Sequence, residues 1–307
     1  MRIIRMILIG LFLGFLQGVP AEGRVLKVVT TTPNLASICQ DIGGEKVVVT
    51  SLIKGNQDPH FIEPRPSMIP VLRDADLFIV IGMELDIWAF SLINAAKNRR
   101  IVPGGIGYLN ASSRIEKLEV PPAGVRIDAS RGHVHPAGNP HYWLDPQNGV
   151  IIAETIANKL TELAPEEKEY FQSNLTNFKK KIQHLITKIQ NQLATFGKIK
   201  ILTYHKSWSY FCKRFGIKIV GELEPLPGVA PSPKHLSETI ELVKKENVPL
   251  IIQEVFYPRR AADFVAGKTN VRVVVVPNSV GGVAAAKDYP GLFEVITQRM
   301  VEALKAK

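Results

Sequence analysis

The chain has 307 residues, of which 46% are hydrophobic and 21% charged, and it contains no low-complexity tract. This length favours two α/β units, each large enough to bury a core. The formal net charge of +10 raises the question of nucleic-acid binding, but the lysines are scattered over helix faces and no stripe interleaves them with aromatic side chains. We therefore expect no nucleic-acid partner.

The N-terminus has the features of a signal peptide. Arg2 and Arg5 form a charged region, and the apolar run 6–16 that follows is too short to span a bilayer. Small residues at 19–21 predict cleavage after Ala21, and no cysteine follows that would accept a bacterial lipid. We expect an exported, periplasmic protein with a signal peptide at 1–21; the alternative is an N-terminal anchor that stays on the chain.

Short β-branched runs alternate with helical patterns in both halves of the chain. The predicted strands are 25–30, 47–53, 77–81 and 100–102 in the first half, and 199–204, 218–223, 250–253 and 271–276 in the second. These runs are continuously apolar, as in parallel strands covered on both faces. Helical segments such as 33–43 and 232–246 lie between them. The pattern predicts two doubly wound α/β lobes.

The middle of the chain is predominantly helical. The segment 148–163 predicts one helix, and Pro165 opens a second that runs without a breaker to about Thr195. A helix of about thirty residues spans ~45 Å, which is longer than one lobe requires. We therefore expect a rigid connecting helix at 165–196, between an N-terminal lobe at 22–164 and a C-terminal lobe at 197–307.

The chain has two cysteines, Cys39 and Cys212. Export makes a disulfide feasible. Each cysteine lies in a helical pattern and in a different half of the chain, so we expect two buried free thiols.

Several polar side chains lie beside the C-terminal ends of predicted strands, or in a loop before a helix. They are His60, His141, His205, Glu254 and Asn278. Open α/β sheets bind ligands at the carboxyl ends of their strands. Imidazole suits zinc, copper and nickel, whereas manganese and magnesium favour more oxygen. On this ground alone, a metal site and ordinary structural roles for these residues both remain open.

Three longer segments resemble the signatures of the zinc- and manganese-binding receptors of ABC transporters. They are Asp58-Pro59-His60-Phe61-Ile62-Glu63-Pro64, Asn139-Pro140-His141-Tyr142-Trp143-Leu144-Asp145-Pro146 and Tyr204-His205-Lys206-Ser207-Trp208-Ser209-Tyr210-Phe211. The resemblance continues through 231–233 and 252–254 and extends from about Val25 to the C-terminus. It implies two α/β lobes joined by a rigid helix, one metal ion in the interlobe cleft, and a monomer that delivers the metal to a membrane permease.

The resemblance also implies the ligands. The first three ligands of the family map onto His60, His141 and His205. Manganese-type members often carry a glutamate at the third of these positions, so His205 favours Zn²⁺ over Mn²⁺. A manganese or iron receptor of the same family is the alternative.

The sequence departs from the family at two places. Asn278 stands where many members have an aspartate as fourth ligand, so the fourth position could be Asn278, Glu254 or water. Glu254 could instead orient a histidine by accepting a hydrogen bond from its ring, without touching the metal. A long histidine-rich loop of zinc-specific members is reduced here to His133 and His135, which could capture metal weakly or belong to an ordinary surface loop.

Two other functional classes compete with the receptor. Three histidines and a water also form catalytic zinc sites, so a zinc-dependent hydrolase is conceivable. The sequence has no His-Glu-x-x-His helix, nucleophile elbow or glycine-rich phosphate loop, and we expect no enzyme. A surface adhesin, a label sometimes attached to relatives, has no separate support in the sequence.

Overall fold

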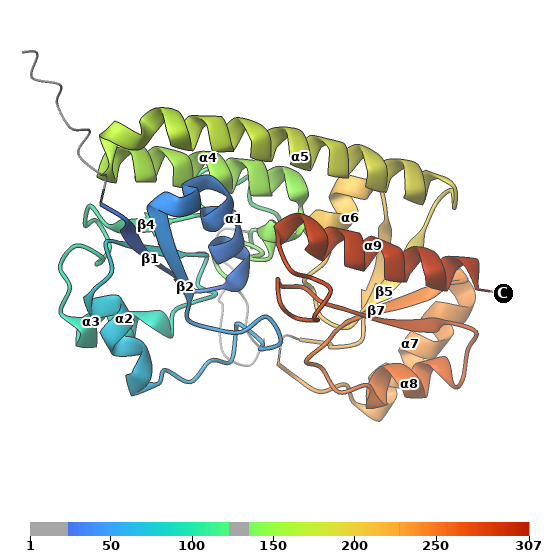
Figure 1. The fold of residues 1–307 in the computed structure, drawn as a ribbon. Helices are drawn as coiled ribbons and strands as arrows, with labels where there is room; N and C mark the ends of the chain where they lie inside the picture. The colour runs from blue at the N-terminus through green and yellow to red at the C-terminus, as the bar shows by residue number, and fades with distance from the viewer. Residues whose placement is uncertain (1–23, 123–134, 227, 307) are drawn as a thin grey trace, which may run out of the picture.

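The computed structural model describes residues 24–122, 135–226 and 228–306, so the predicted signal peptide and His133 lie outside the described residues. The chain forms two α/β lobes, each built on a four-stranded parallel sheet, and both lobes lie along one long helix (Figure 1). The predicted fold class is confirmed.

The first lobe contains a sheet of order β2-β1-β3-β4. Its strands are β1 (Leu26–Thr30), β2 (Val47–Ser51), β3 (Leu77–Val80) and β4 (Tyr108–Asn110), and its helices are α1 (Pro33–Gly43), α2 (Ile69–Arg73) and α3 (Ala89–Ala96). All four residues of β3 are buried, as expected for a strand covered on both faces.

The prediction of the fourth strand of this lobe was wrong. A strand was expected at 100–102, but these residues form turns and the strand lies at Tyr108–Asn110. The carbonyls of Arg100 and Val102 accept hydrogen bonds from Gly107 and Gly105, so they are used within a turn. The apolar character of Ile101 reflects its burial in the core beneath this turn rather than a place in the sheet.

The second lobe repeats the arrangement with the order β6-β5-β7-β8. Its strands are β5 (Lys200–Thr203), β6 (Lys218–Glu222), β7 (Leu250–Glu254) and β8 (Arg272–Val276), and its helices are α6 (Ser209–Phe215), α7 (Pro233–Glu246), α8 (Arg260–Ala266) and α9 (Tyr289–Lys305). Because β5, β7 and β8 are neighbours in a parallel sheet, the segments that follow them emerge at one edge.

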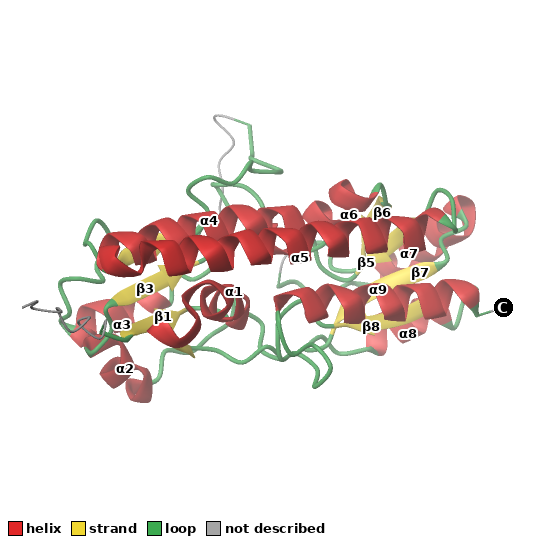
Figure 2. Ribbon diagram, turned by 45° about the horizontal axis from the view of Figure 1, so that its top comes forward, coloured by secondary structure: helices red, strands yellow, loops and turns green. Residues whose placement is uncertain are grey.

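Two antiparallel helices, α4 (Pro146–Leu163) and α5 (Lys168–Ala194), run side by side along one face of the molecule (Figure 2). The Asp145 side chain caps α4 by accepting from the backbone N–H of Gln147. The connecting helix begins slightly later than predicted, because Pro165–Glu167 forms a short 3₁₀ turn. Further 3₁₀ turns lie at Gly44–Lys46, Pro66–Met68 and Tyr142–Leu144.

The apolar face of α5 joins the cores of the two lobes. The helix is 27 residues long, and its buried residues recur about every three or four positions from Phe171 to Leu193. They belong to one continuous cluster that includes Leu26 of the first sheet and Ile201 of the second. The connecting helix is therefore packed over its whole length and is part of a shared core.

Both cysteines are buried and free, as predicted. Burial raises the pKa of the Cys39 thiol to about 12 and also raises that of Cys212. Within the described part of the chain, no helix combines the length and apolarity that a bilayer crossing requires.

Candidate metal centre

Three histidines that are far apart in the sequence meet between the two lobes. His60 lies in the connection after β2, His141 directly precedes the turn that leads into α4, and His205 follows β5. One ring nitrogen of each lies within 4.8 Å of the others, and the ring centroids are 5.1–5.2 Å apart. No other group of three or more such side chains is found in the described ranges.

His60 is held by the aspartate two positions before it. One Asp58 oxygen, Oδ1, lies 3.0 Å from the His60 backbone nitrogen and 2.8 Å from its ring Nδ1. Burial alone would raise the pKa of Asp58, but the hydrogen bonds and charge of His60 outweigh it and lower the pKa. The ionised carboxylate can only accept, so His60 Nδ1 is the donor, and when the ring is neutral Nε2 carries the lone pair.

His141 is held in the same way by an amide. Asn139 Oδ1 lies 3.0 Å from the His141 backbone nitrogen and 2.9 Å from its ring Nδ1. Burial, and then the charges of His60, His205 and His135, lower the pKa of His141 well below its usual value. The ring is therefore neutral. Its Nε2 is buried and has no hydrogen-bond partner among the residues the structure describes.

His205 is held by a carboxylate from the end of the neighbouring strand. Its Nδ1 lies 2.5 Å from Glu224 Oε2, and Glu224 Oε1 accepts from the backbone of Gly228 at 2.7 Å. Burial lowers the pKa of His205, but the hydrogen bond to Glu224 and the nearby carboxylates outweigh it, so that the net shift is upward. A metal ion that binds here must compete with a proton.

Glu254 and Asn278 lie at the same edge of the second sheet as His205. Glu254, completely buried at the end of β7, accepts from Trp208 Nε1 at 3.1 Å, and burial raises its pKa to about 7. The hydrogen bond to His205 that could have come from Glu254 is made by Glu224 instead. Glu254 Oε2 and Asn278 Oδ1 are buried atoms with no hydrogen-bond partner in the described part of the chain.

His135 lies closer to the cluster than a surface-loop residue would. Its ring centroid is 5.3 Å from that of His60, although it does not join the group of three. The structure thus brings the described member of the predicted auxiliary pair to the rim of the cluster.

The side chains that hold the histidines were not predicted from the sequence. Asp58 and Asn139 could have been found, since each forms an Asp/Asn-Pro-His tripeptide, and the Asp or Asn side chain favours hydrogen bonds two residues onward. Glu224 had no such local signal, because it lies 19 residues from His205.

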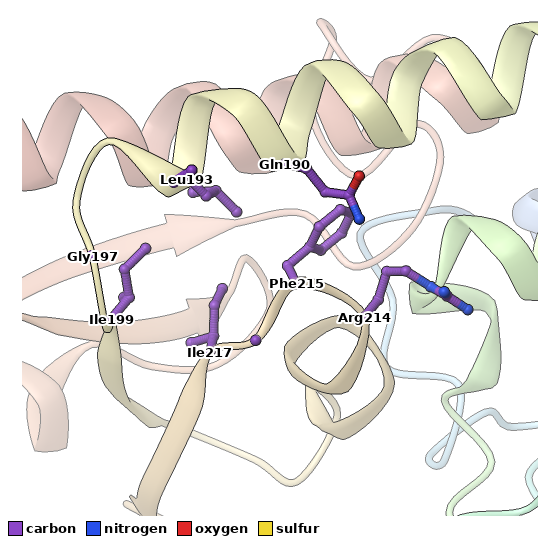
Figure 3. A pocket seen from close by; sticks show the side chains of 9 residues that line it. Gln190, Leu193, Gly197, Ile199, Arg214, Phe215 and Ile217 are labelled. Atoms are coloured by element: carbon purple, nitrogen blue, oxygen red, sulfur yellow. The ribbon is translucent and has the colours of Figure 1, made fainter.

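A separate groove lies at the far end of α5, between this helix and the turn from α6 to β6 (Figure 3). It encloses about 320 Å³ and is lined by residues that include Gln190, Leu193, Arg214 and Phe215. None of the clustered histidines lines this groove, so it is not part of the candidate metal centre.

Two parallel-sheet lobes on a long shared helix, with buried histidines converging between them, define the class of two-lobed metal-ion receptors. The family described as "Zinc-uptake complex component A periplasmic" has a sequence model that matches residues 28–303, and the chain belongs to this family. It is a family of substrate-binding proteins rather than enzymes.

Curated relatives carry the names of both manganese and zinc proteins. The chain is 26% identical to the manganese ABC transporter substrate-binding lipoprotein PsaA of Streptococcus mitis, over 82% of this chain and 80% of that protein. It is 25% identical to the zinc-binding protein AdcA of Streptococcus pyogenes, over 83% of this chain and half of that protein.

Solved structures share the fold. A crystal structure of ZnuA superposes with a TM-score of 0.77 at 22% identity, covering 91% of this chain and 99% of that chain. The substrate-binding protein FpvC of Pseudomonas aeruginosa, in complex with Mn²⁺, also gives a TM-score of 0.77, at 23% identity, with 92% and 99% covered.

Proposed function

We propose that this chain captures Zn²⁺ with His60, His141 and His205 and delivers it to the membrane permease of an ABC importer. The observation that carries the proposal is the common orientation of the three rings. Each Nδ1 is engaged by a side-chain oxygen, at 2.8, 2.9 and 2.5 Å, which directs the lone pair on each Nε2 toward the cluster. Three imidazoles whose Nε2 atoms are available as ligands suit a zinc ion.

The donor chemistry supports zinc over manganese. Zinc accepts nitrogen ligands readily, whereas manganese favours carboxylate, carbonyl and water oxygen. Asp58 and Glu224 are carboxylates, but each is hydrogen-bonded to a histidine nitrogen. Their carboxylates are hydrogen-bonded to the Nδ1 atoms of His60 and His205, and this increases the basicity of the Nε2 atoms that would bind the metal.

The fourth position is open to an oxygen ligand. Asn278 Oδ1 and Glu254 Oε2 are both buried atoms available for this role, and a water could also fill it. His135, beside His60, is suited to pass metal into the cluster, in the auxiliary role expected of the pair His133 and His135.

The delivery step requires export. The N-terminal signal expected at 1–21 places the protein in the periplasm, and the relatives named as ABC-transporter substrate-binding lipoproteins support an exported location and a permease partner. We propose that the chain acts as a monomer, because each lobe contributes ligands to one site.

The test is removal of single ligands. Replacing His60, His141 or His205 by alanine should weaken Zn²⁺ binding by more than the ~10–100-fold that follows from losing a residue hydrogen-bonded to a ligand. Competition titration against a chromophoric chelator measures the affinity, and circular dichroism verifies that both lobes remain folded.

His184→Ala is the matched control, because His184 is an exposed histidine on α5 outside the cluster. It should leave zinc binding unchanged. An unchanged zinc affinity in the His205→Ala protein would show that the assignment of the site is wrong, and tighter binding of Mn²⁺ than of Zn²⁺ by the unmodified protein would favour the manganese receptor.

A further inference from the structure

Asn139 is a buried side chain that contacts both halves of the candidate site. It lies two residues before His141 and only 6% of it is exposed. Its oxygen, Oδ1, receives the hydrogen bonds from His141, while its nitrogen, Nδ2, points the other way. That nitrogen lies 2.8 Å from the backbone carbonyl of Lys206 and 3.0 Å from Glu119 Oε2.

These partners determine which way the amide faces. The Lys206 carbonyl and the Glu119 carboxylate are acceptors, so the group facing them must be the NH₂. Turning the amide over would place its oxygen against two other oxygens. Oδ1 therefore faces His141, and the neutral ring must carry its proton on Nδ1. The lone pair of His141 then lies on Nε2, the buried nitrogen that remains to serve as its ligand atom in the histidine cluster.

The same amide reaches the second lobe. Lys206 directly follows His205, so the hydrogen bond from Asn139 Nδ2 to the Lys206 carbonyl holds the segment that carries the third histidine. Tyr210 of α6 anchors the other side, because its hydroxyl donates to the Asn139 carbonyl at 3.0 Å and accepts from the Leu118 backbone at 3.0 Å.

We propose that Asn139 is a positioning residue with two functions: it sets the tautomer of His141, and it ties the His141 segment to the His205 segment across the lobes. A carboxylate performs the first function at His60, where Asp58 accepts from the ring. A carboxylate cannot perform the second, because it has no hydrogen to donate to Lys206 and would repel Glu119. The geometry thus requires an amide at this position. The expected effect on affinity rests on the proposed zinc function.

The tautomer is tested in the metal-free protein by long-range ¹H–¹⁵N NMR of the histidine rings. His141 should be protonated on Nδ1 in the unmodified protein and in Asn139→Asp, and should lose this preference in Asn139→Ala. Asn98→Ala is the control, because Asn98 also donates to backbone carbonyls, but these belong to Leu72 and Ala75 at the end of α2 and not to the segments that carry the histidines. Protonation of His141 on Nε2, or an unchanged tautomer in Asn139→Ala, would overturn the first function.

The second function, the hydrogen bond between Asn139 and the Lys206 carbonyl, is tested by measuring zinc affinity. Asn139→Ala should weaken Zn²⁺ binding by about 10–100-fold, and Asn139→Asp should recover only part of the loss. In a His141→Ala background, Asn139→Ala should still weaken binding, because the link to Lys206 remains to be lost. Full affinity in Asn139→Asp, or no effect in the His141→Ala background, would overturn the second function. A protein that shows the expected tautomer but never binds zinc would refute the proposed function and leave the tautomer assignment intact.

Discussion

His60 and His141 are held by the same local hydrogen-bonding pattern, except that the side chain that accepts the bonds is an acid for His60 and an amide for His141. Asp58 and Asn139 each stand two residues before a histidine, with proline between them, and each accepts from the backbone and ring nitrogens of that histidine. The Asp58 carboxylate places a negative charge beside the His60 ring. The Asn139 amide adds no charge beside the His141 ring, but its NH₂ group can donate a hydrogen bond. Two histidines with similar surroundings therefore differ in how strongly their partners increase their basicity.

A single atom at the fourth position should set the metal preference. Asn278 Oδ1 is buried without a hydrogen-bond partner in the described ranges. Asn278→Asp should tighten Zn²⁺ binding and bring Mn²⁺ within reach, because it adds an anionic oxygen, which manganese favours. Competition titration with the two metals measures both affinities. No change in either would mean that this side chain does not reach the metal.

Glu254 should make the metal-free protein sensitive to pH. Its pKa is raised mainly by burial, from 4.5 to about 7. Between these values the folded protein binds the extra proton, so stability should fall as pH rises through this range. Glu254→Gln should abolish this loss of stability. The variant should therefore have a free energy of unfolding up to about 3 kcal/mol higher than the unmodified protein at pH 7 and above, and a similar one below pH 4.5. Urea unfolding of both proteins across the range provides the measurement, and parallel curves would contradict the prediction.

At the scale of elements, the connection after β8 is fastened to the first lobe. Val280 donates its backbone N–H to Asn34 of α1 at 2.9 Å, and Trp143 donates to the carbonyl of Asn278 at 2.8 Å. Gly55, in the connection after β2, lies against the same segment. A side chain there would approach the carbonyl of Val280 to 2.0 Å and the nitrogen of Gly282 to 2.4 Å. Only glycine allows the two connections to meet this closely.

The close approach of Gly55 to the connection after β8 predicts what a methyl group added at Gly55 would do. Gly55→Ala should separate the connections that carry His60 and Asn278, weaken zinc binding several-fold and lower the free energy of unfolding by about 1–3 kcal/mol. Gly267→Ala is the control, because its nearest obstacle is 3.3 Å away at the end of α8. Zinc titration and urea unfolding test the pair. Equal behaviour of the two variants would show that the connections move apart freely.

At the scale of the whole molecule, the lobes are built to stay together. Helix α5 runs for 27 residues with buried positions along its length, and the core is continuous across both lobes. Bending such a helix breaks backbone hydrogen bonds and requires a kink site, but α5 contains no proline or glycine. A two-pronged ion pair between Arg214 and Asp145, with both contacts at 2.8 Å, adds a tie close to the site.

We therefore expect little rigid-body motion when metal binds. Small-angle scattering of the metal-free and zinc-loaded forms should give nearly identical radii of gyration, while hydrogen exchange slows in the segments around His60, His135 and His141. A large decrease in the radius of gyration would contradict the rigid-connector interpretation and indicate hinge closure.

The sequence by itself determined the features that depend on near neighbours. Alternating β-branched and helical runs predicted two parallel-sheet lobes and a long helix between them, because the periods of buried residues are local properties. The histidines at 60, 141 and 205 stood out because they fall at strand ends or in loops within recognisable segments.

The tertiary structure decided what depends on distant partners. It placed the fourth strand of the first lobe at Tyr108–Asn110, because the Arg100 carbonyl is used in a turn. It assigned the partner of His205 to Glu224, because the adjacent parallel strands β5 and β6 carry both residues to one edge of the sheet. It also joined Asn139 to the segment of His205, through a hydrogen bond to the Lys206 carbonyl, which is 67 residues away in the sequence. No local pattern encodes such contacts, since they exist only when the lobes are folded against each other.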